Sequence, residues 1–317
     1  MKRTIEISSP GLHVRREDRH LVLESEGRRI GAVPLEDLGV VITDNCQLTL
    51  TSAALEGIAE CGAVLIACGS NHLPIGTFLP LVANTTSGER LRAQCAASLP
   101  LQKGLWAALV RSKILNQAEV LRRSGCDADL RPLAREVRSG DVGNIEARAA
   151  QAYWPLLFRD CPLESQPFRR DREGASPNAL LNYGYAVLRA CVARALVGAG
   201  LHPGLGIHHH NRYDPMPLAS DVMEPFRAWV DARVLELARQ GKLELDRDAK
   251  RLLLGILTDR CVGSWGEGPL ALAIERTASS LARCMLSADA GEPAPEVAAR
   301  LLLPEWPEPD SDASRGS

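Results

Sequence analysis

The chain lacks any hydrophobic run long enough to cross a membrane. Its longest uninterrupted apolar stretch of note covers residues 62–68, whereas a transmembrane helix needs about 20 apolar residues. The opening residues, MKRTIEISSPG, hold no apolar core of a secretory signal. We therefore expect a cytoplasmic protein that is neither secreted nor embedded in a membrane.

Paired cysteine spacings are also absent. The chain has nine cysteines, an odd number, and none is spaced as Cys-x-x-Cys or lies near the histidines at zinc-ligand spacing. A disulfide scaffold or a zinc site is therefore not expected. Reduced cysteines that act mainly as small core hydrophobes fit a cytosolic protein better.

Lysine is scarce, since only five of the 37 basic residues are lysine and the rest are arginine. A GC-rich genome produces this bias without any function, although arginine also suits phosphate binding. The net charge is −2, of which residues 289–317 contribute −5, so residues 1–288 carry +3. A mildly basic body permits nucleic-acid binding without demanding it.

Two domains are expected from 317 residues that are 45% hydrophobic. Short apolar or alternating segments separated by turns predict a β-rich region up to residue 80, with strands near 4–7, 21–24, 39–42 and 63–67. One helix, capped by Ser52, is predicted over residues 52–60. From about Ser87 the apolar residues recur every three or four positions, which is typical of helices. The predicted helices are 88–98, 101–123, 128–138, 144–157, 177–199, 218–240, 246–258 and 268–287.

The predicted fold class is therefore α+β, with a small N-terminal β-rich domain followed by a larger all-α domain. The β-rich domain covers residues 1–80, a linker 81–87 and the α-domain 88–288. Residues 289–317 are rich in proline and acid, which predicts a disordered tail, above all after Leu303.

The densest group of candidate ligands is a histidine run in the segment GIHHHNRYDP, residues 206–215. Four of the seven histidines lie within residues 202–210. The flanking glycines and prolines indicate a loop. This loop is either a solvated polar segment or part of a functional site.

A pair of carboxylates follows the histidine run. Asp221 and Glu224 are spaced i,i+3, so on a helix they share one face. Two like charges about 4 Å apart repel by about 4 kcal/mol at an effective dielectric of about 20. A divalent cation reverses that penalty, and carboxylates with a neutral imidazole suit Mg²⁺ or Mn²⁺. A favourable interaction with the helix dipole is the alternative explanation.

A further carboxylate, Glu146, lies at the start of a predicted helix for which Asn144 can supply the cap. Glu146 shares a helical stripe with Ala150, Tyr153 and Leu157. A carboxylate on a packing face is costly unless it is paired or binds a metal. Alternatively, Glu146 only satisfies the helix dipole.

A charged loop and a polar helix face lie between these two carboxylate segments. Arginine, asparagine and tyrosine side chains can hydrogen-bond phosphate or orient carboxylates. The alternative is a solvated loop and polar contacts between packed helices. The two sets are Arg169, Arg170 and Arg172 in the loop, and Asn178, Asn182 and Tyr185 on the helix.

Four segments, NIEA, NALLNYGY, GIHH and DVMEPFR, resemble in order and spacing the CRISPR-associated spacer-acquisition integrase/endonuclease family, the "Cas one" proteins. They begin at Asn144, Asn178, Gly206 and Asp221. The last segment and its histidine loop resemble the type II branch, found beside the large single-chain RNA-guided nuclease. Residues 70–76 also resemble the exit of that family's β-domain, and the resemblance covers about residues 1–288.

The resemblance implies a catalytic metal site formed by Glu146, His209 and Glu224. His208 is the second choice for the histidine. The family's third ligand is often aspartate, whereas Glu224 stands at the matching position here. Asp221 is implied to lie close by, beside the metal or as an extra ligand. The residues implied to build the surrounding pocket are Asn178, Asn182 and Tyr185.

The implied activity is metal-dependent DNA cleavage and joining with Mg²⁺ or Mn²⁺. The 3′-hydroxyl of a short captured DNA attacks a phosphodiester at the border of a CRISPR repeat, and water in its place gives a nuclease. The family works as two homodimers bridged by a dimer of the small "Cas two" partner. Arg169, Arg170 and Arg172 are expected to hold DNA phosphates.

Two other functions use the same residues. One is a divalent-metal hydrolase of a small phosphoester, and the other is a catalytically inactive DNA-binding scaffold. The sequence leaves open which histidine binds the metal and whether the metal is Mg²⁺ or Mn²⁺.

Overall fold

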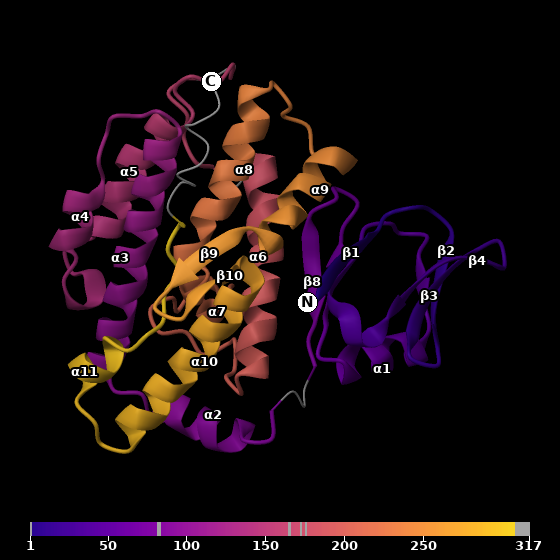
Figure 1. The fold of residues 1–317 in the computed structure, drawn as a ribbon, viewed down its shortest axis with the longest axis horizontal. Coiled ribbons are helices and arrows are strands. Elements are labelled where there is room, and N and C mark those ends of the chain that lie inside the picture. Colours follow the sequence, from indigo (N-terminus) through magenta and orange to yellow (C-terminus); the bar gives the residue numbers. More distant parts are fainter. Residues whose placement is uncertain (1, 81–83, 164–165, 172, 175, 308–317) are drawn as a thin grey trace.

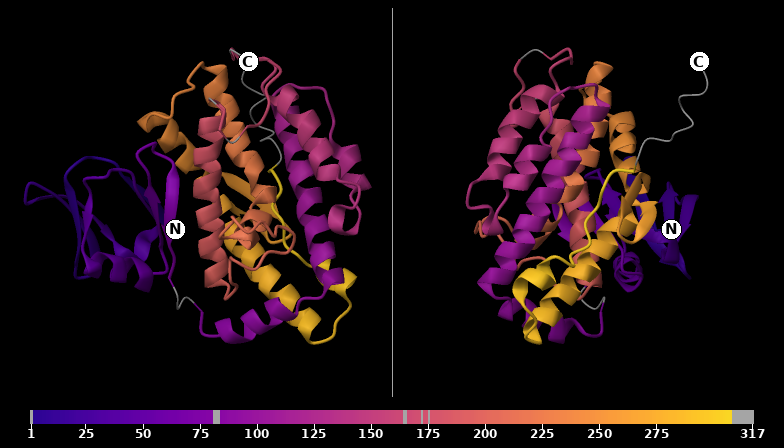
Figure 2. Two further views of the ribbon diagram at one scale, coloured as in Figure 1. Left: turned by 180° about the vertical axis from the view of Figure 1, so that it is seen from behind. Right: turned by 60° about the vertical axis from the view of Figure 1, so that its left-hand side comes forward.

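The structure is a computed structural model that describes residues 2–80, 84–163, 166–171, 173–174 and 176–307. Figure 1 shows two lobes, with the strands of the first part of the chain gathered at one end and helices filling the rest. Figure 2 shows the same division from behind and from the side. The α+β fold class predicted from the sequence is confirmed.

The β-lobe consists of two four-stranded sheets and one helix. The first sheet has the order β1-β5-β7-β8, with β1, β5 and β7 parallel and β8 antiparallel; the second has the order β4-β3-β2-β6. The strands are Arg3–Ile7 (β1), Leu12–Glu17 (β2), His20–Ser25 (β3), Arg28–Pro34 (β4), Leu38–Thr43 (β5), Thr49–Leu50 (β6), Val64–Cys68 (β7) and Pro74–Phe78 (β8). The helix α1 covers Ser52–Glu60.

The sheet containing β5 is buried on both faces. Side chains alternate along a strand, so Val41 and Leu65 pack inside the β-lobe, whereas Val40 and Ile42 join the core of the helical lobe. Every residue of β5 is buried, as expected for a central parallel strand. One sheet thus serves two hydrophobic cores, and this joins the lobes.

The predicted strands and the predicted helix of the β-lobe are confirmed, whereas β2, β4, β6 and β8 were not predicted. The predicted cap of α1 is wrong by one residue. Thr51 is the N-cap, and its hydroxyl accepts a hydrogen bond from the Ala54 N–H at 3.1 Å. Thr51 has the extended backbone that a cap requires, whereas Ser52 is already helical.

The helical lobe surrounds two long central helices, α3 and α6. Its largest fully buried side chains include Trp106, Tyr153, Phe158, Phe226 and Trp229. The helices are Ser87–Ala96 (α2), Leu99–Arg123 (α3), Arg131–Glu136 (α4), Ile145–Leu157 (α5), Asn178–Gly198 (α6), Pro217–Val222 (α7), Arg227–Arg239 (α8), Arg247–Gly255 (α9), Leu270–Asp289 (α10) and Ala294–Ala298 (α11). Among the described residues, α6 alone is long and apolar enough to span a membrane, and 72% of its apolar window is buried inside the protein.

One predicted helix, over residues 218–240, is divided in the structure. It forms α7, a 3₁₀ turn at Glu224–Phe226, and α8. Pro225 explains the break, because proline lacks an N–H and disfavours helical backbone at the preceding residue. A hairpin of β9 (Arg260–Gly263) and β10 (Gly266–Pro269) was not predicted.

The prediction of a disordered tail is wrong as far as residue 307. Residues 301–307, here called the C-terminal strap, dock on the helical lobe. Glu305 pairs with Val262 through two backbone hydrogen bonds of 2.8 and 3.0 Å, and Trp306 stacks on Trp229 with ring centroids 4.5 Å apart. The apolar side chains among the prolines and acids provide the burial that holds the strap. The predicted tail residues 308–317 lie outside the described residues.

Candidate functional site

Two of the predicted site residues, Glu146 and Glu224, meet at a buried lysine of α3. The Lys113 ammonium nitrogen lies 2.5 Å from Glu146 Oε1 and 2.6 Å from Glu224 Oε2. The side chains of Lys113 and Glu224 are 7% and 5% exposed, whereas that of Glu146 is 27% exposed. Three segments far apart in sequence therefore place two carboxylates around one cation.

The start of α5 fixes the backbone of Glu146. The Asp141 carboxylate accepts hydrogen bonds from the backbone N–H of Ile145 at 2.9 Å and of Glu146 at 3.0 Å. Asp141 therefore satisfies the first N–H groups of the helix. The predicted cap, Asn144, makes no such hydrogen bond and has left-handed backbone with φ of 49°.

Glu224 is held from two sides. Arg227 donates to Glu224 Oε1 at 2.8 Å, while Lys113 faces Oε2. Burial alone would raise the pKa of Glu224, but the charges of Arg227 and Lys113 outweigh burial and lower the pKa well below its usual range. Glu224 is therefore ionised at neutral pH.

A buried network connects Arg227 to α5. The Arg227 guanidinium lies over the Tyr185 ring, 4.1 Å from its centroid. The Tyr185 hydroxyl donates to Asp231 Oδ1, and the Tyr153 hydroxyl donates to Asp231 Oδ2 at 3.0 Å. Tyr153 belongs to α5, so one carboxylate ties together α5, α6 and α8. Tyr185 was predicted near the site, whereas its partner Asp231 was not.

Asp221 holds the backbone of the histidine loop through hydrogen bonds. Its carboxylate is fully buried and accepts hydrogen bonds from the backbone N–H of Ile207 at 2.6 Å, His208 at 2.9 Å and His209 at 3.1 Å. The same carboxylate lies 2.5 Å from His209 Nδ1. Asp221 is thus a partner of the loop that orients His209.

The two histidines differ in environment. The hydrogen bond to Asp221 raises the pKa of His209, whereas burial lowers the pKa of His208. The His208 ring stacks on Trp106 with centroids 4.1 Å apart. The negative charges of Glu224 and Glu146 also raise the pKa of His209, so the histidine loop interacts electrostatically with the carboxylate pair.

The described residues do not assemble a group of three His, Cys, Asp or Glu side chains in metal-binding geometry. Glu146 and Glu224 share Lys113, and His209 is paired with Asp221. The ligand set of Glu146, His209 and Glu224 stays a prediction, as does the choice between His209 and His208.

The polar face of α6 holds the neighbouring loop. Arg170 donates to Asn178 Oδ1 at 2.9 Å and to Asn182 Oδ1 at 2.5 Å, and its guanidinium lies 5.6 Å from the centroid of the Tyr185 ring. The two asparagines therefore clamp Arg170. Arg169 is exposed, and Arg172 lies outside the described residues. DNA binding by these arginines stays a prediction.

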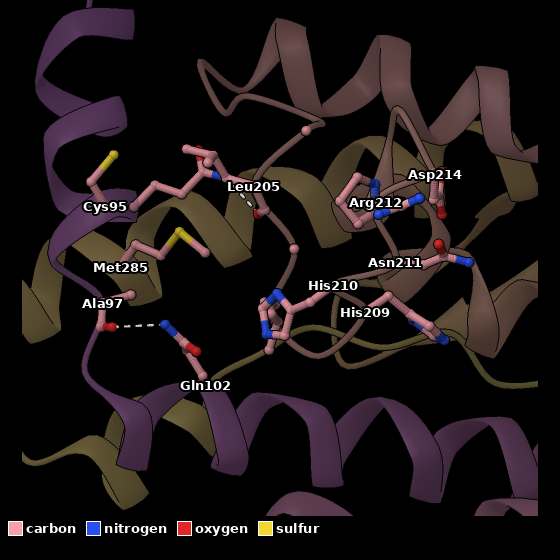
Figure 3. A pocket seen from close by; sticks show the side chains of 15 residues that line it. Cys95, Ala97, Gln102, Leu205, His209, His210, Asn211, Arg212, Asp214 and Met285 are labelled. Carbon is pink, nitrogen blue, oxygen red and sulfur yellow. Dashed lines mark hydrogen bonds between the residues drawn. The ribbon is translucent and has the colours of Figure 1, made fainter.

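A cavity of about 430 Å³ opens beside the histidine loop. Figure 3 shows His209, His210 and Arg212 around it, with Cys95, Gln102 and Met285 on the other side. Of the predicted site residues, only His209 lines this cavity, so the cavity extends the site on the histidine side and does not include the carboxylates.

The sequence analysis missed Lys113, Asp231 and Arg227. Lys113 carried a usable signal, because it lies four residues from each of Leu109 and Gln117 on the stripe that begins at Trp106. A charge on a buried stripe must be paired. Asp231 carried the same signal, because the buried Ala228, Val234 and Leu235 lie three or four residues from it on α8, but its two tyrosine partners come from other helices.

The fold and the site together define a two-lobed α+β protein with a buried carboxylate pair beside a carboxylate-bound histidine. The sequence model of CRISPR associated protein Cas1 matches residues 5–260. The chain belongs to the Cas1 family, as its resemblance to this family implied.

A curated relative and two solved structures are similar to the chain. The CRISPR-associated endonuclease Cas1 of Neisseria meningitidis is 42% identical over 231 residues, 72% of this chain and 73% of that protein. A structure described as "Casposase bound to integration product" matches with a TM-score of 0.77 and 18% identity, over 93% of this chain and 94% of that chain. A "Cas6-RT-Cas1--Cas2 complex" matches with a TM-score of 0.74 and 17% identity, over 97% of this chain and 36% of that chain. At these identities the two structures show a shared fold.

Proposed function

We propose that this Cas1 chain is a metal-dependent DNA endonuclease and integrase of CRISPR adaptation. It joins the 3′-hydroxyl ends of captured DNA to the repeat of a CRISPR array by transesterification. The observation that carries the proposal is the convergence of Glu146 and Glu224 on one cation position. The Neisseria relative, named an endonuclease, supports the class of activity.

The residues at this position fit a divalent cation. Two carboxylates already surround a positive charge, and His209 has its Nδ1 bound to Asp221, which leaves Nε2 for another partner. A carboxylate-bound histidine beside carboxylates is a common donor set for Mn²⁺ and Mg²⁺. Glu146, His209 and Glu224 would hold the ion, and a bound ion would polarise the phosphodiester and stabilise the charge that develops on its oxygens.

The protein's own groups have separate tasks in this proposal. Arg227 holds Glu224 in one orientation, and Asp141 fixes the turn that presents Glu146. Asp221 sets the ring orientation of His209, which binds at the site or accepts the proton of the attacking hydroxyl. No protein nucleophile is required.

The assembly belongs to the same proposal. The working form is two homodimers bridged by a dimer of the small Cas2 partner, acting in the cytoplasm on two ends of one DNA. The 15-residue interval from His209 to Glu224 supports a place in the type II branch. Phosphate contacts by Arg169, Arg170 and Arg172 would make DNA affinity fall steeply with salt.

A strand-transfer assay tests the function. Purified protein, with and without its small partner, is mixed with a labelled short duplex and a supercoiled plasmid that carries the repeat, in Mg²⁺, Mn²⁺ or EDTA. We expect metal-dependent joining that Glu146→Ala, His209→Ala and Glu224→Ala each reduce by at least about 100-fold. Glu244→Ala, an exposed glutamate, is the matched control and keeps full activity.

Other outcomes favour other functions. Tight DNA binding without joining under any metal would favour the inactive scaffold. Absence of both joining and DNA binding would mean that the chain shares the fold of its relatives but not their activity on DNA. Small phosphoesters would then be screened as substrates.

A further inference from the structure

Lys113 stands where the proposed function needs a divalent cation. Its ammonium lies 2.5 Å from Glu146 Oε1 and 2.6 Å from Glu224 Oε2. A divalent ion bound between the same oxygens would lie within a few ångströms of the ammonium. Two cations this close in a buried site repel strongly, so they cannot share this position.

The two cations on Glu224 are not equivalent. Arg227 is locked, because it donates to Oε1 at 2.8 Å and stacks over the Tyr185 ring. Lys113 approaches Oε2 closely, yet this buried oxygen accepts no well-directed hydrogen bond from the described residues. Glu224 therefore has one oxygen fixed by a stacked guanidinium, and its other oxygen is paired at 2.6 Å with an ammonium that has no such fixed orientation.

Chemistry also separates lysine from arginine at this place. An ammonium on a flexible four-carbon stem has no fixed fork and can move to another anion, whereas a stacked guanidinium is fixed. A buried ammonium that leaves two carboxylates needs a new negative partner. In the proposed reaction, the anion that enters the site is a DNA phosphate.

We propose that Lys113 is a placeholder cation, which holds Glu146 and Glu224 together in the metal-free protein and weakens divalent-metal binding until a DNA phosphate arrives. The inference rests on the proposed function and adds a regulation of the same site. Because linkage is reciprocal, DNA raises metal affinity and metal raises DNA affinity. The free protein is thereby kept from holding a loaded site without its substrate.

Direct metal binding tests this inference without any activity measurement. Metal-stripped full-length protein is titrated with Mn²⁺ and followed by electron paramagnetic resonance, with and without a short blunt duplex, after subtraction of Mn²⁺ bound by DNA alone. We expect DNA to raise the affinity of the wild type by about 10-fold or more, within the usual range of coupling between sites. If DNA leaves the wild-type affinity unchanged, the inference is overturned, and this arm requires no variant.

A substitution then assigns the coupling to Lys113. We expect Lys113→Met to bind Mn²⁺ about 10-fold more tightly than the wild type without DNA, and to lose most of the DNA effect. Lys242→Met, at an exposed position, is the control and leaves both affinities unchanged. Equal or weaker Mn²⁺ binding by a folded Lys113→Met would contradict the placeholder role.

Two further variants separate this inference from the proposed function. Glu146→Gln and Glu224→Gln should each weaken Mn²⁺ binding. If neither does, the ion binds elsewhere, and the proposed function and the inference both fail. If both weaken binding while Lys113→Met does not strengthen it, the placeholder role alone fails.

Discussion

Asp231 is a buried carboxyl whose ionisation affects the stability of the helical lobe. It is fully buried and accepts hydrogen bonds from Tyr153 and Tyr185. Burial raises its pKa to about 6, against the opposing effects of the Tyr185 hydrogen bond and the charge of Arg227. The network that supports Glu224 therefore contains a carboxyl that titrates near neutral pH.

The first prediction concerns this titration. In the unfolded chain Asp231 loses its proton near pH 3.8, whereas the folded protein keeps the proton up to about pH 6. Its contribution to the free energy of unfolding therefore falls as pH rises from about 4 to 6, by up to about 3 kcal/mol, and stays low above pH 6. Asp231→Asn removes this titration. Urea unfolding of wild type and variant at pH 5, 6 and 7 should show that the free energy of unfolding of the wild type increases relative to that of the variant as pH falls. A difference between the two that does not vary with pH would contradict the raised pKa of Asp231.

The elements α3 and the C-terminal strap support the turn that carries Glu224. Asn116 of α3 donates to the carbonyl of Pro225 at 2.9 Å and to that of Pro304 at 3.1 Å. Ser112, one turn earlier, donates to the same Pro304 carbonyl at 3.2 Å. One buried amide thus bridges the 3₁₀ turn and the strap.

We expect Asn116→Ala to lower the free energy of unfolding by about 1–3 kcal/mol, because it leaves one buried carbonyl without its donor and weakens the support of another. Ser112→Ala is the matched control. Ser112→Ala should lower the free energy of unfolding by less, since Asn116 still donates to the Pro304 carbonyl. Urea unfolding measures both, and equal losses would contradict the bridging role of Asn116.

The sequence predicted these elements to different degrees. Long periodic segments such as α3 and α6 were predicted within about two residues, because burial of one face dictates their pattern. The strap was not predicted because its position depends on the stacking of Trp306 on Trp229, a contact between distant residues that no local sequence pattern reveals. For the site, the carboxylates and histidines were visible as motifs. The stripe around Lys113 indicated a buried charge, but the identity of its two partners, which come from other segments, could not be read from the sequence.

At the scale of the whole molecule, a buried ion pair joins the two lobes. Lys250 of α9 contacts the Asp44 carboxylate, which follows β5, and its ammonium lies 4.0 Å from Glu6 of β1. The side chains of Lys250 and Asp44 are only 7% and 2% exposed. Figure 1 shows α9 beside β1 at this junction.

We expect Lys250→Met to lower the free energy of unfolding by about 3 kcal/mol, the lower end for a broken buried pair, because Asp44 loses its lysine but keeps the His72 ring nitrogen 2.9 Å from its other oxygen. The double variant Asp44→Asn with Lys250→Met should recover part of this loss, since both charges are gone. Chemical unfolding of the single and double variants measures the coupling. Additive losses in the double variant would contradict a direct pair.

The strap also has a consequence for the order in which the protein is made. Its contacts with Ser112 and Asn116 join residues 192 and 188 positions apart. On the ribosome, Pro304 emerges eighty residues after Glu224, a delay of about 4–16 s at roughly 5–20 residues per second. During that interval the nascent chain contains Glu146 and Glu224 but lacks the strap that shares Asn116 with the turn at Pro225. Translation itself thus delays the final support of the site until nearly the whole helical lobe has been synthesised.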